Sequence, residues 1–332
     1  MRPRIYVPVI VLVTIPILYF ATRVYFFIHL FKQHSGIAIS QAEVAIAYNT
    51  TKDVNDHEYT QRIPKIIHHI WHVWNVGDDA DNQAMPGDWS IMRDGCKELN
   101  PGWEFKLWTT KSSGEFIAGS YPWFLNTYDG YKYPVQRVDT VRYFLMRHYG
   151  GIYMDLDNGC NANLNPTLYY PAFLMDGGRG VLNNNILGAA PNHPFWELLT
   201  DSLISYNYDY LFPFITVSWA SGQWFETSVW EQYHSLVRRI AKGEKGVSEA
   251  VTEYQKKNDI KDMKLFLMGM DERDGRYEEW VFFSEGRGGT WVQWDLAMFV
   301  WLGGHWKALI FLVCMAIGGI VLRCVRFWGK RS

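Results

Sequence analysis

Two aspartates separated by a single residue are the feature of this sequence with the clearest chemical potential. Asp155 and Asp157 directly follow the short apolar run 152–154. Side chains at positions i and i+2 of a strand point to the same side, so both carboxylates can converge on one hard cation. Ligands made only of oxygen suit Mg²⁺ or Mn²⁺, which can bridge such carboxylates to a diphosphate. The pair therefore predicts a divalent-cation site at the end of a buried strand.

Three other interpretations of the aspartate pair compete with the cation site. An EF-hand loop needs an acid at its twelfth position, and counting from Asp155 that position is Pro166. A phosphotransferase with an aspartyl nucleophile expects Thr or Val where this chain has Gly159. A solvated turn remains an alternative interpretation, because the bare DxD pattern is common. The position at the end of an apolar strand, after Gly150-Gly151, favours the cation site.

A second pair of charges lies just upstream, within residues 134–149. Pro134 is typical of a helix start and Gly150-Gly151 of its end. At helical spacing Asp139 and Arg142 share a stripe with the apolar residues Val135, Val138, Leu145, Met146 and Tyr149. Two buried charges cost several kcal/mol each unless they are paired or bind a ligand. They can simply pair with each other, but their closeness in sequence to the aspartates favours a shared site.

The surrounding elements predict an α/β sheet. Residues 63–73 and 103–109 are typical of strands, and the strand 152–154 follows the helix 134–149. Strand, helix and strand in this order place ligands at the carboxyl ends of strands. A net charge of −2 gives no basis for binding nucleic acid.

Both ends of the 332-residue chain indicate membrane attachment. The runs 5–22 and 308–322 carry no charge and are flanked by basic residues, so we expect a transmembrane helix at each end. A cleaved signal peptide and a buried C-terminal helix are the alternatives. By the positive-inside rule both termini face the cytosol and the middle of the chain is lumenal. There, Asn49 begins an N-glycosylation triplet, and Cys96 and Cys160 are able to pair, although the sequence leaves both points open.

The order of several sequence blocks resembles the fungal DxD mannosyltransferases. The resemblance runs from about residue 63 to residue 233. The sequence resembles the catalytic subunits of mannosyl-inositol-phosphorylceramide synthase more closely than it resembles the Golgi enzyme that initiates N-glycan outer chains. The blocks that carry it are IPKIIHHIW, LWT, YPWFL, YKYPVQRVDTVRYFLMRHYGGIYMDLDNGC, PAFL and HPFW.

This resemblance implies a GT-A nucleotide-sugar-binding fold with a Rossmann-like mixed sheet, GDP-mannose as donor, Mn²⁺ (or Mg²⁺) as cofactor and retention of configuration. It implies that Asp155 and Asp157 hold the metal, and that Asp139 and Arg142 are catalytic residues that contact the donor together with Asp155. Trp291 matches a donor-binding position, but Val292 stands where the family commonly has His. Thr290 or water would then substitute, and reduced activity, another acceptor or a pseudo-enzyme stay open.

The expected organisation is a cytosolic tail and anchor (1–31), a stem (32–62), a lumenal catalytic domain (63–297), a transmembrane helix (298–323) and a basic tail (324–332). The expected function is transfer of mannose to the inositol headgroup of inositol phosphorylceramide in the Golgi or another endomembrane, with a regulatory membrane subunit as a possible partner. An N-glycan mannosyltransferase and a catalytically weak membrane scaffold are the alternatives.

Overall fold

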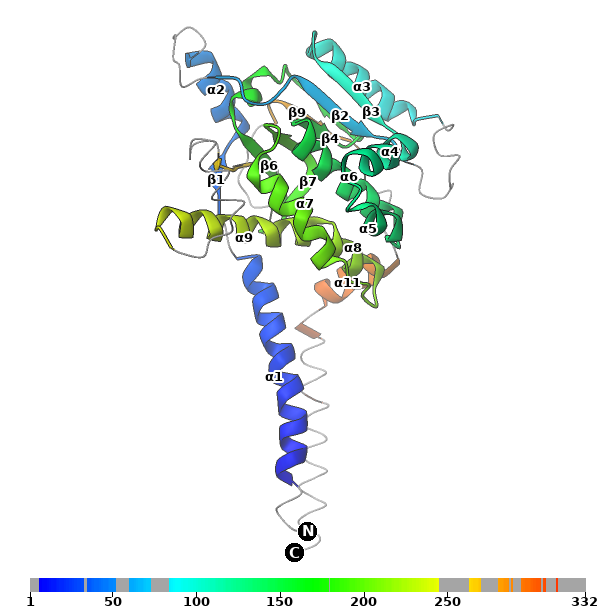
Figure 1. Ribbon diagram of the computed structural model, residues 1–332, viewed down its shortest axis with the longest axis vertical. Coiled ribbons are helices and arrows are strands. Elements are labelled where there is room, and N and C mark those ends of the chain that lie inside the picture. Colours follow the sequence, from blue (N-terminus) through cyan, green and yellow to red (C-terminus); the bar gives the residue numbers. More distant parts are fainter. Residues whose placement is uncertain are drawn as a thin grey trace, which may run out of the picture. The chain divides into compact units, whose positions relative to one another are not determined.

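The protein contains two units of unequal size (Figure 1). In a computed structural model, the main unit comprises Met1–Asp209 and Val217–Gly288, and the small unit comprises Tyr210–Thr216 and Gly289–Ser332. The structure describes residues 6–32, 35–51, 60–72, 84–178, 180–244, 263–269, 280–286, 288, 294–305, 307–308 and 315.

A mixed sheet forms the centre of the main unit, in the strand order β1-β8-β6-β7-β4-β2-β3. Strand β7 is antiparallel to its neighbours β6 and β4, and the other adjacent pairs are parallel. The predicted α/β architecture is confirmed at this level. The strands span Ile37–Ile39 (β1), Ile66–Ile70 (β2), Glu104–Trp108 (β3), Gly151–Met154 (β4), Ala172–Asp176 (β6), Leu182–Ala189 (β7) and Phe266–Met268 (β8).

Helices cover both faces of this sheet, which is why its central strands are apolar on both sides. Within β4, Tyr153 belongs to one buried cluster, whereas Ile152 and Met154 belong to the other. The first cluster also takes residues from α4 (Thr110–Ser120), α5 (Leu125–Gly130), α6 (Pro134–His148), α7 (Pro194–Tyr206) and α9 (Gln223–Ala241). The second takes residues from α2 (Gln41–Thr51), α3 (Gly87–Leu99) and the 3-10 helix η3 (Asn165–Tyr169).

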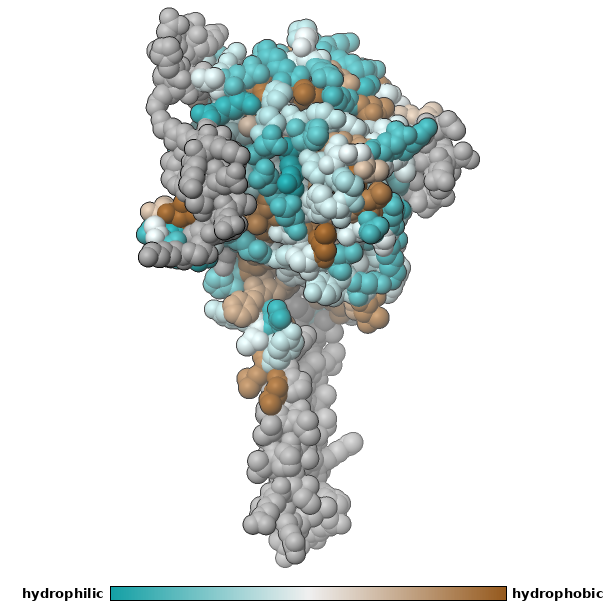
Figure 2. Space-filling view, viewed as in Figure 1, coloured by the Kyte–Doolittle hydropathy of each residue, from teal (hydrophilic) through white to brown (hydrophobic). Residues whose placement is uncertain are grey.

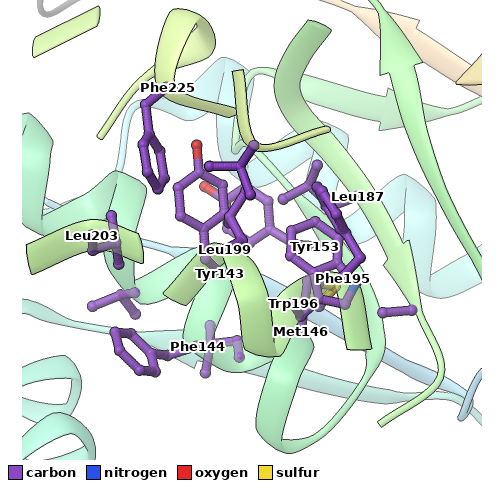
Figure 3. Packing of buried hydrophobic residues seen from close by; sticks show 14 of the residues in the cluster. Tyr143, Phe144, Met146, Tyr153, Leu187, Phe195, Trp196, Leu199, Leu203 and Phe225 are labelled. Atoms are coloured by element: carbon purple, nitrogen blue, oxygen red, sulfur yellow. The ribbon is translucent and has the colours of Figure 1, made fainter. Parts of the chain in front are cut away.

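Aromatic side chains fill the space between α6, α7 and α9 (Figure 3). Tyr143 of α6 stacks on Trp196 of α7, with ring centroids 6.1 Å apart, and its ring lies 6.2 Å from that of Phe225 of α9. All three side chains are buried. This packing fixes the face of α6 that also carries Asp139 and Arg142.

Helix α6 leads directly into β4 through two glycines. The backbone N–H of Tyr133 donates to Oε1 of Gln136 at 3.0 Å, which satisfies one donor at the helix start. Gly150 and Gly151 have φ values of +62° and +88°. A side chain on Gly150 would also place its Cβ 2.5 Å from the carbonyl oxygen of Ala189. The predicted helix and its glycine stop are therefore confirmed.

A smaller two-stranded sheet, β5 (Asn158–Cys160) with β9 (Phe283–Glu285), follows the aspartate pair. Cys160 of β5 forms a disulfide with Cys96 of α3. The pairing that the sequence left open is thus present in the structure.

Within the main unit, the C-terminal end of helix α1 (Tyr6–Leu30) packs against α9. The ring of Phe27 lies 5.0 Å from that of Trp224 and 5.8 Å from that of Trp219. Figure 2 shows hydrophobic surface on this helix, where Leu18 and Phe26 are exposed. Within the described parts of the chain, no helix meets the length and apolarity needed to span a membrane. The spanning character predicted for residues 1–31 is therefore not confirmed.

The small unit contains α11 (Trp294–Gly304) and the first part of α8 (Pro213–Ala220). The buried carboxylate of Asp295 accepts a hydrogen bond from the backbone N–H of Phe214 at 2.6 Å. Rings of Phe212 and Phe299 pack beside this bond, 5.3 Å apart. Most of the predicted transmembrane helix 298–323 and all of the basic tail 324–332 lie outside the described residues.

Candidate active site

The aspartate pair lies at the carboxyl end of β4, as the sequence predicts. The backbone N–H of Asp155 donates to the carbonyl of Asn185 on β7 at 2.8 Å, so the neighbouring strand fixes the point where β4 ends. The Asp155 side chain is 31% exposed, which leaves it accessible to a ligand. Asp157 lies two residues further on, in the loop between β4 and β5.

Arg142 connects the helix pair to the aspartate pair. Its Nη1 lies 3.2 Å from Oδ1 of Asp155, and its Nη2 lies 3.3 Å from Oδ1 of Asp139. Nη1 also donates to the carbonyl of Asn184 at 2.7 Å. Burial disfavours the charged guanidinium, but Asp155, Tyr153 and Asp139 outweigh it and raise the pKa of Arg142. Asp139, Arg142 and Asp155, predicted to share one site, therefore do so.

Asp139 is held by neutral hydrogen-bond donors as well as by Arg142. Nδ2 of Asn184 donates to its Oδ1 at 3.1 Å, and Oγ of Ser221 donates to its Oδ2 at 3.0 Å. Burial raises the pKa of Asp139 to about 6, against the opposing effect of Arg142. The carboxylate is thus fixed in place but remains ionised at neutral pH.

Three residues of this cluster were missed from the sequence. The hydroxyl of Tyr153 donates a hydrogen bond to Oδ1 of Asp155, and its ring lies beneath the Arg142 guanidinium, 4.7 Å from Cζ to the ring centroid. Asn184 and Ser221 contact Asp139 from segments 45 and 82 residues away along the chain. Tyr153 could have been found, because it lies on β4 two residues before Asp155, which follows the strand directly. No sequence feature close to Asn184 or Ser221 indicates that they contact Asp139.

Asp157 experiences repulsion from two other carboxylates, which Arg142 only partly offsets. Burial is the largest cause that raises its pKa to about 6, followed by repulsion from Asp155. Glu285 of β9 adds to this repulsion. The backbone of Gly288 also lies against this carboxylate, and a side chain at position 288 would collide with Oδ2 of Asp157. A bound cation would relieve this repulsion.

The two aspartates suit a divalent cation whose remaining ligands come from the substrate and from water. Within the residues that the structure describes, no group of three or more His, Cys, Asp or Glu side chains is placed to hold a metal ion. Mg²⁺ and Mn²⁺ sites of phosphate-transferring enzymes commonly use one or two carboxylates, with substrate phosphates and water as the other ligands. Asp155 and Asp157 fit this pattern. Asp155 is already engaged by Arg142 and Tyr153, so Asp157 is the freer of the two.

A further acid lies beneath the site. Glu226 of α9 is fully buried, and neither of its carboxyl oxygens has a hydrogen-bond partner among the described residues. Burial raises its pKa to about 8, Arg142 lowers it and Asp139 raises it. Glu226 is therefore uncharged at neutral pH, and sequence periodicity did not single it out.

The C-terminal end of the predicted catalytic domain carries the remaining predictions for the donor site. Trp291, Val292 and Thr290 lie outside the described residues. The predicted role of Trp291 and the question of a substitute for the missing His stay predictions.

Residues 86–174 match the family described as "Glycosyltransferase sugar-binding region containing DXD motif". All four predicted side chains of the cluster fall within this segment, namely Asp139, Arg142, Asp155 and Asp157.

Curated relatives extend the match beyond this segment. Inositol phosphoceramide mannosyltransferase 3 of Schizosaccharomyces pombe is 40% identical over 188 residues, which are 55% of this chain and 50% of that protein. Mannosyl phosphorylinositol ceramide synthase SUR1 of Saccharomyces cerevisiae is 39% identical over 173 residues, which are 52% of this chain and 43% of that protein. Inositol phosphoceramide mannosyltransferase 2 of Schizosaccharomyces pombe is 31% identical over 252 residues, 76% of this chain and 65% of that protein.

The chain thus spans about half the length of the first two relatives. Among solved structures, the PaToxG glycosyltransferase aligns with a TM-score of 0.39 and 14% identity, over 67% of this chain and 93% of that one. The similarity to DxD mannosyltransferases predicted from the sequence is confirmed by the family match and the curated relatives, for the segment that carries Asp139, Arg142, Asp155 and Asp157.

Proposed function

We propose that this protein is a GT-A-type retaining mannosyltransferase that moves mannose from GDP-mannose to the inositol headgroup of inositol phosphorylceramide. One observation carries the proposal: Arg142 joins Asp139 to Asp155 at the carboxyl end of β4, next to the acid-rich loop of Asp157. The names of the relatives at 39–40% identity, an inositol phosphoceramide mannosyltransferase and a mannosyl phosphorylinositol ceramide synthase, supply the sugar and the acceptor.

In this proposal each side chain of the cluster has a separate task. Asp157, whose pKa is raised by burial and by Asp155, takes the divalent cation together with Asp155. Arg142 holds Asp155 from the protein side, so that its carboxylate keeps one orientation. Asp139, fixed by Asn184 and Ser221, offers its carboxylate as a hydrogen-bond acceptor for the sugar hydroxyls of the donor.

The bound Mn²⁺ or Mg²⁺ would supply positive charge next to the leaving diphosphate. Arg142 adds a second, permanent positive charge, since its ion pairs hold it protonated. Transfer on the front face fits this arrangement best: the acceptor hydroxyl attacks the anomeric carbon and gives its proton to the leaving phosphate. Double displacement would require a carboxylate nucleophile close to the anomeric carbon, as in retaining glycosidases. We assign no residue to that role.

A membrane assay tests the proposal. Membranes from cells that express the full chain are incubated with labelled GDP-mannose, inositol phosphorylceramide and Mn²⁺, and lipids and N-glycans are then separated. We expect label in the sphingolipid, dependence on Mn²⁺, and loss of the product in Asp157→Asn. Asp201→Asn is the matched control, because Asp201 is an exposed acid that pairs with Arg147. Label only in N-glycans, or full activity of Asp157→Asn, would refute the proposal.

The proposal includes the cellular compartment in which the protein acts. A disulfide such as Cys96–Cys160 is typical of proteins that fold in an oxidising compartment. We therefore place the main unit in the lumen of the Golgi or another endomembrane, in contact with the lipid acceptor. The terminal anchors and a regulatory membrane subunit stay predictions from the sequence. Glycosylation of Asn49, which is exposed at the end of α2, would support this placement.

A further inference from the structure

The loop that carries Asp157 depends on two attachments of unequal strength. At its start, β4 is fixed in the central sheet between β2 and β7. At its end, β5 pairs, among the described residues, with β9 alone, and each of these strands is three residues long. Such a two-stranded sheet is marginally stable by itself. The position of Asp157 therefore depends on whatever else holds β5.

The disulfide between Cys160 and Cys96 is the covalent part of this attachment. Cys160 is the last residue of β5, three positions after Asp157, and Cys96 is fully buried in the second core cluster. Helix α3, which carries Cys96, is itself held by hydrogen bonds to the segment that precedes η3. Nδ2 of Asn100 donates to the carbonyl of Cys96 at 2.9 Å, and the backbone N–H of Leu164 donates to Oδ1 of Asn100 at 2.7 Å.

Close packing transmits this attachment to the aspartate. Gly159 has no room for a side chain, because a Cβ would lie 2.6 Å from Oγ of Ser284 on β9 and 3.6 Å from Cβ of Met92 on α3. Immediately after β9, the backbone N–H of Gly286 donates to the carbonyl of Asp157 at 2.6 Å. Helix α3, β5 and β9 thus form one packed group with Asp157 at its edge.

We propose that the Cys96–Cys160 disulfide is a positioning element for Asp157, so that breaking it weakens divalent-cation binding at the aspartate pair while the central sheet stays folded. This inference rests on the proposed function, because it assumes that Asp155 and Asp157 bind the cation. Cys96 and Cys160 act only through the β5 segment and contact neither cation nor donor.

The direct test measures Mn²⁺ binding to the full-length protein in detergent, from the electron paramagnetic resonance signal of free Mn²⁺. The double variant Cys96→Ala/Cys160→Ala is compared with the wild type. Loss of a group that orients a metal ligand commonly lowers metal affinity 10–100-fold, so we expect a Kd for Mn²⁺ that is raised about 10-fold or more. An unchanged Kd would overturn the positioning role.

Two further measurements separate positioning from a general loss of stability. Leu199→Ala removes a buried side chain of α7 in the first core cluster, away from the packed group. It should lower the melting temperature while leaving the Kd for Mn²⁺ unchanged. In the folded wild type, a trialkylphosphine can reduce the disulfide: the S–S bond gives two thiols, and water supplies two protons and the oxygen of the phosphine oxide. After the phosphine is removed under argon, the reduced protein should show the weak binding of the double variant.

The same binding measurement distinguishes failure of the positioning role from failure of the cation site. If wild-type protein binds Mn²⁺ and Asp157→Asn does not, the cation site stands, and the comparison with the disulfide variant decides the positioning role. Reduced wild type that binds as tightly as oxidised wild type overturns the positioning role alone. No Asp157-dependent binding in the wild type overturns the cation site, and with it this inference.

Discussion

Glu226 should make the protein less stable as the pH rises, and Glu226→Gln should remove this dependence. The pKa of Glu226 is raised from 4.5 to about 8, because burial disfavours the carboxylate. Between these two values the unfolded chain has lost the proton and the folded chain has kept it. Stability therefore falls as pH rises from about 4.5 to about 8, and the loss stays constant above that range. A neutral glutamine has no proton to lose.

The size of the effect follows from the pKa shift. At 1.36 kcal/mol for each pKa unit, the shift from 4.5 to about 8 corresponds to about 5 kcal/mol, as an upper limit. A change of 1 kcal/mol in stability shifts the melting temperature of a protein of this size by about 2 °C. The melting temperature of Glu226→Gln should therefore rise, relative to that of the wild type, by about 10 °C between pH 4.5 and pH 8.

The assay is a melting curve of both proteins, in the same detergent, at half-unit pH steps from 4.5 to 8.5. Leu199→Ala serves as the control, because it changes no titrating group and should lower the melting temperature by a similar amount at every pH. If the wild-type and Glu226→Gln curves run parallel across the range, Glu226 titrates in the folded protein as it does in the unfolded chain, and the predicted pH dependence is refuted.

Three further variants test the cluster around Arg142. Arg142→Lys should reduce turnover about 100-fold, because one ammonium cannot reach Asp139, Asp155 and the carbonyl of Asn184 together, and steady-state kinetics will check this. Asp139→Asn should lower turnover far more than the melting temperature; a loss of roughly 3–5 kcal/mol of stability with turnover kept would instead indicate a structural ion pair. Tyr153→Phe keeps the ring under Arg142 but loses the hydroxyl on Asp155, so the Kd for Mn²⁺, measured by titration, should rise about 10-fold.

The parts of the fold that the sequence predicts are those with a strong local pattern. Helix α6 carries a proline start, an apolar stripe and a double-glycine stop, so its bounds and the position of Asp155 after β4 follow from residues within about twenty positions. Strand β1 has only three residues and lies in the segment 32–62 that we expected to be a stem, yet it pairs with β8. A strand of this length is too short to show the alternation of polar and apolar residues by which strands are predicted.

The same distinction holds for the site. Asp139 and Arg142 were found because charges on an apolar helical stripe conflict with the pattern around them. Asn184 and Ser221 conflict with nothing nearby, and only the folded chain brings them to Asp139. Glu226 is similar, because its burial comes from tertiary packing of α9 and not from its sequence neighbours.

The antiparallel direction of β7 affects how the site can diverge among related sequences. In a parallel strand only the last residues reach the ligand edge, and the chain must then cross over through a helix. Strand β7 runs the other way, so its first residues, including Asn184 and Asn185, lie beside Asp155, and the turn from β6 into β7 borders the same edge. That turn can lengthen or vary without moving a crossover helix. Relatives with other acceptors would therefore be expected to differ in the residues between Asp176 and Leu182, while the cluster around Arg142 stays the same.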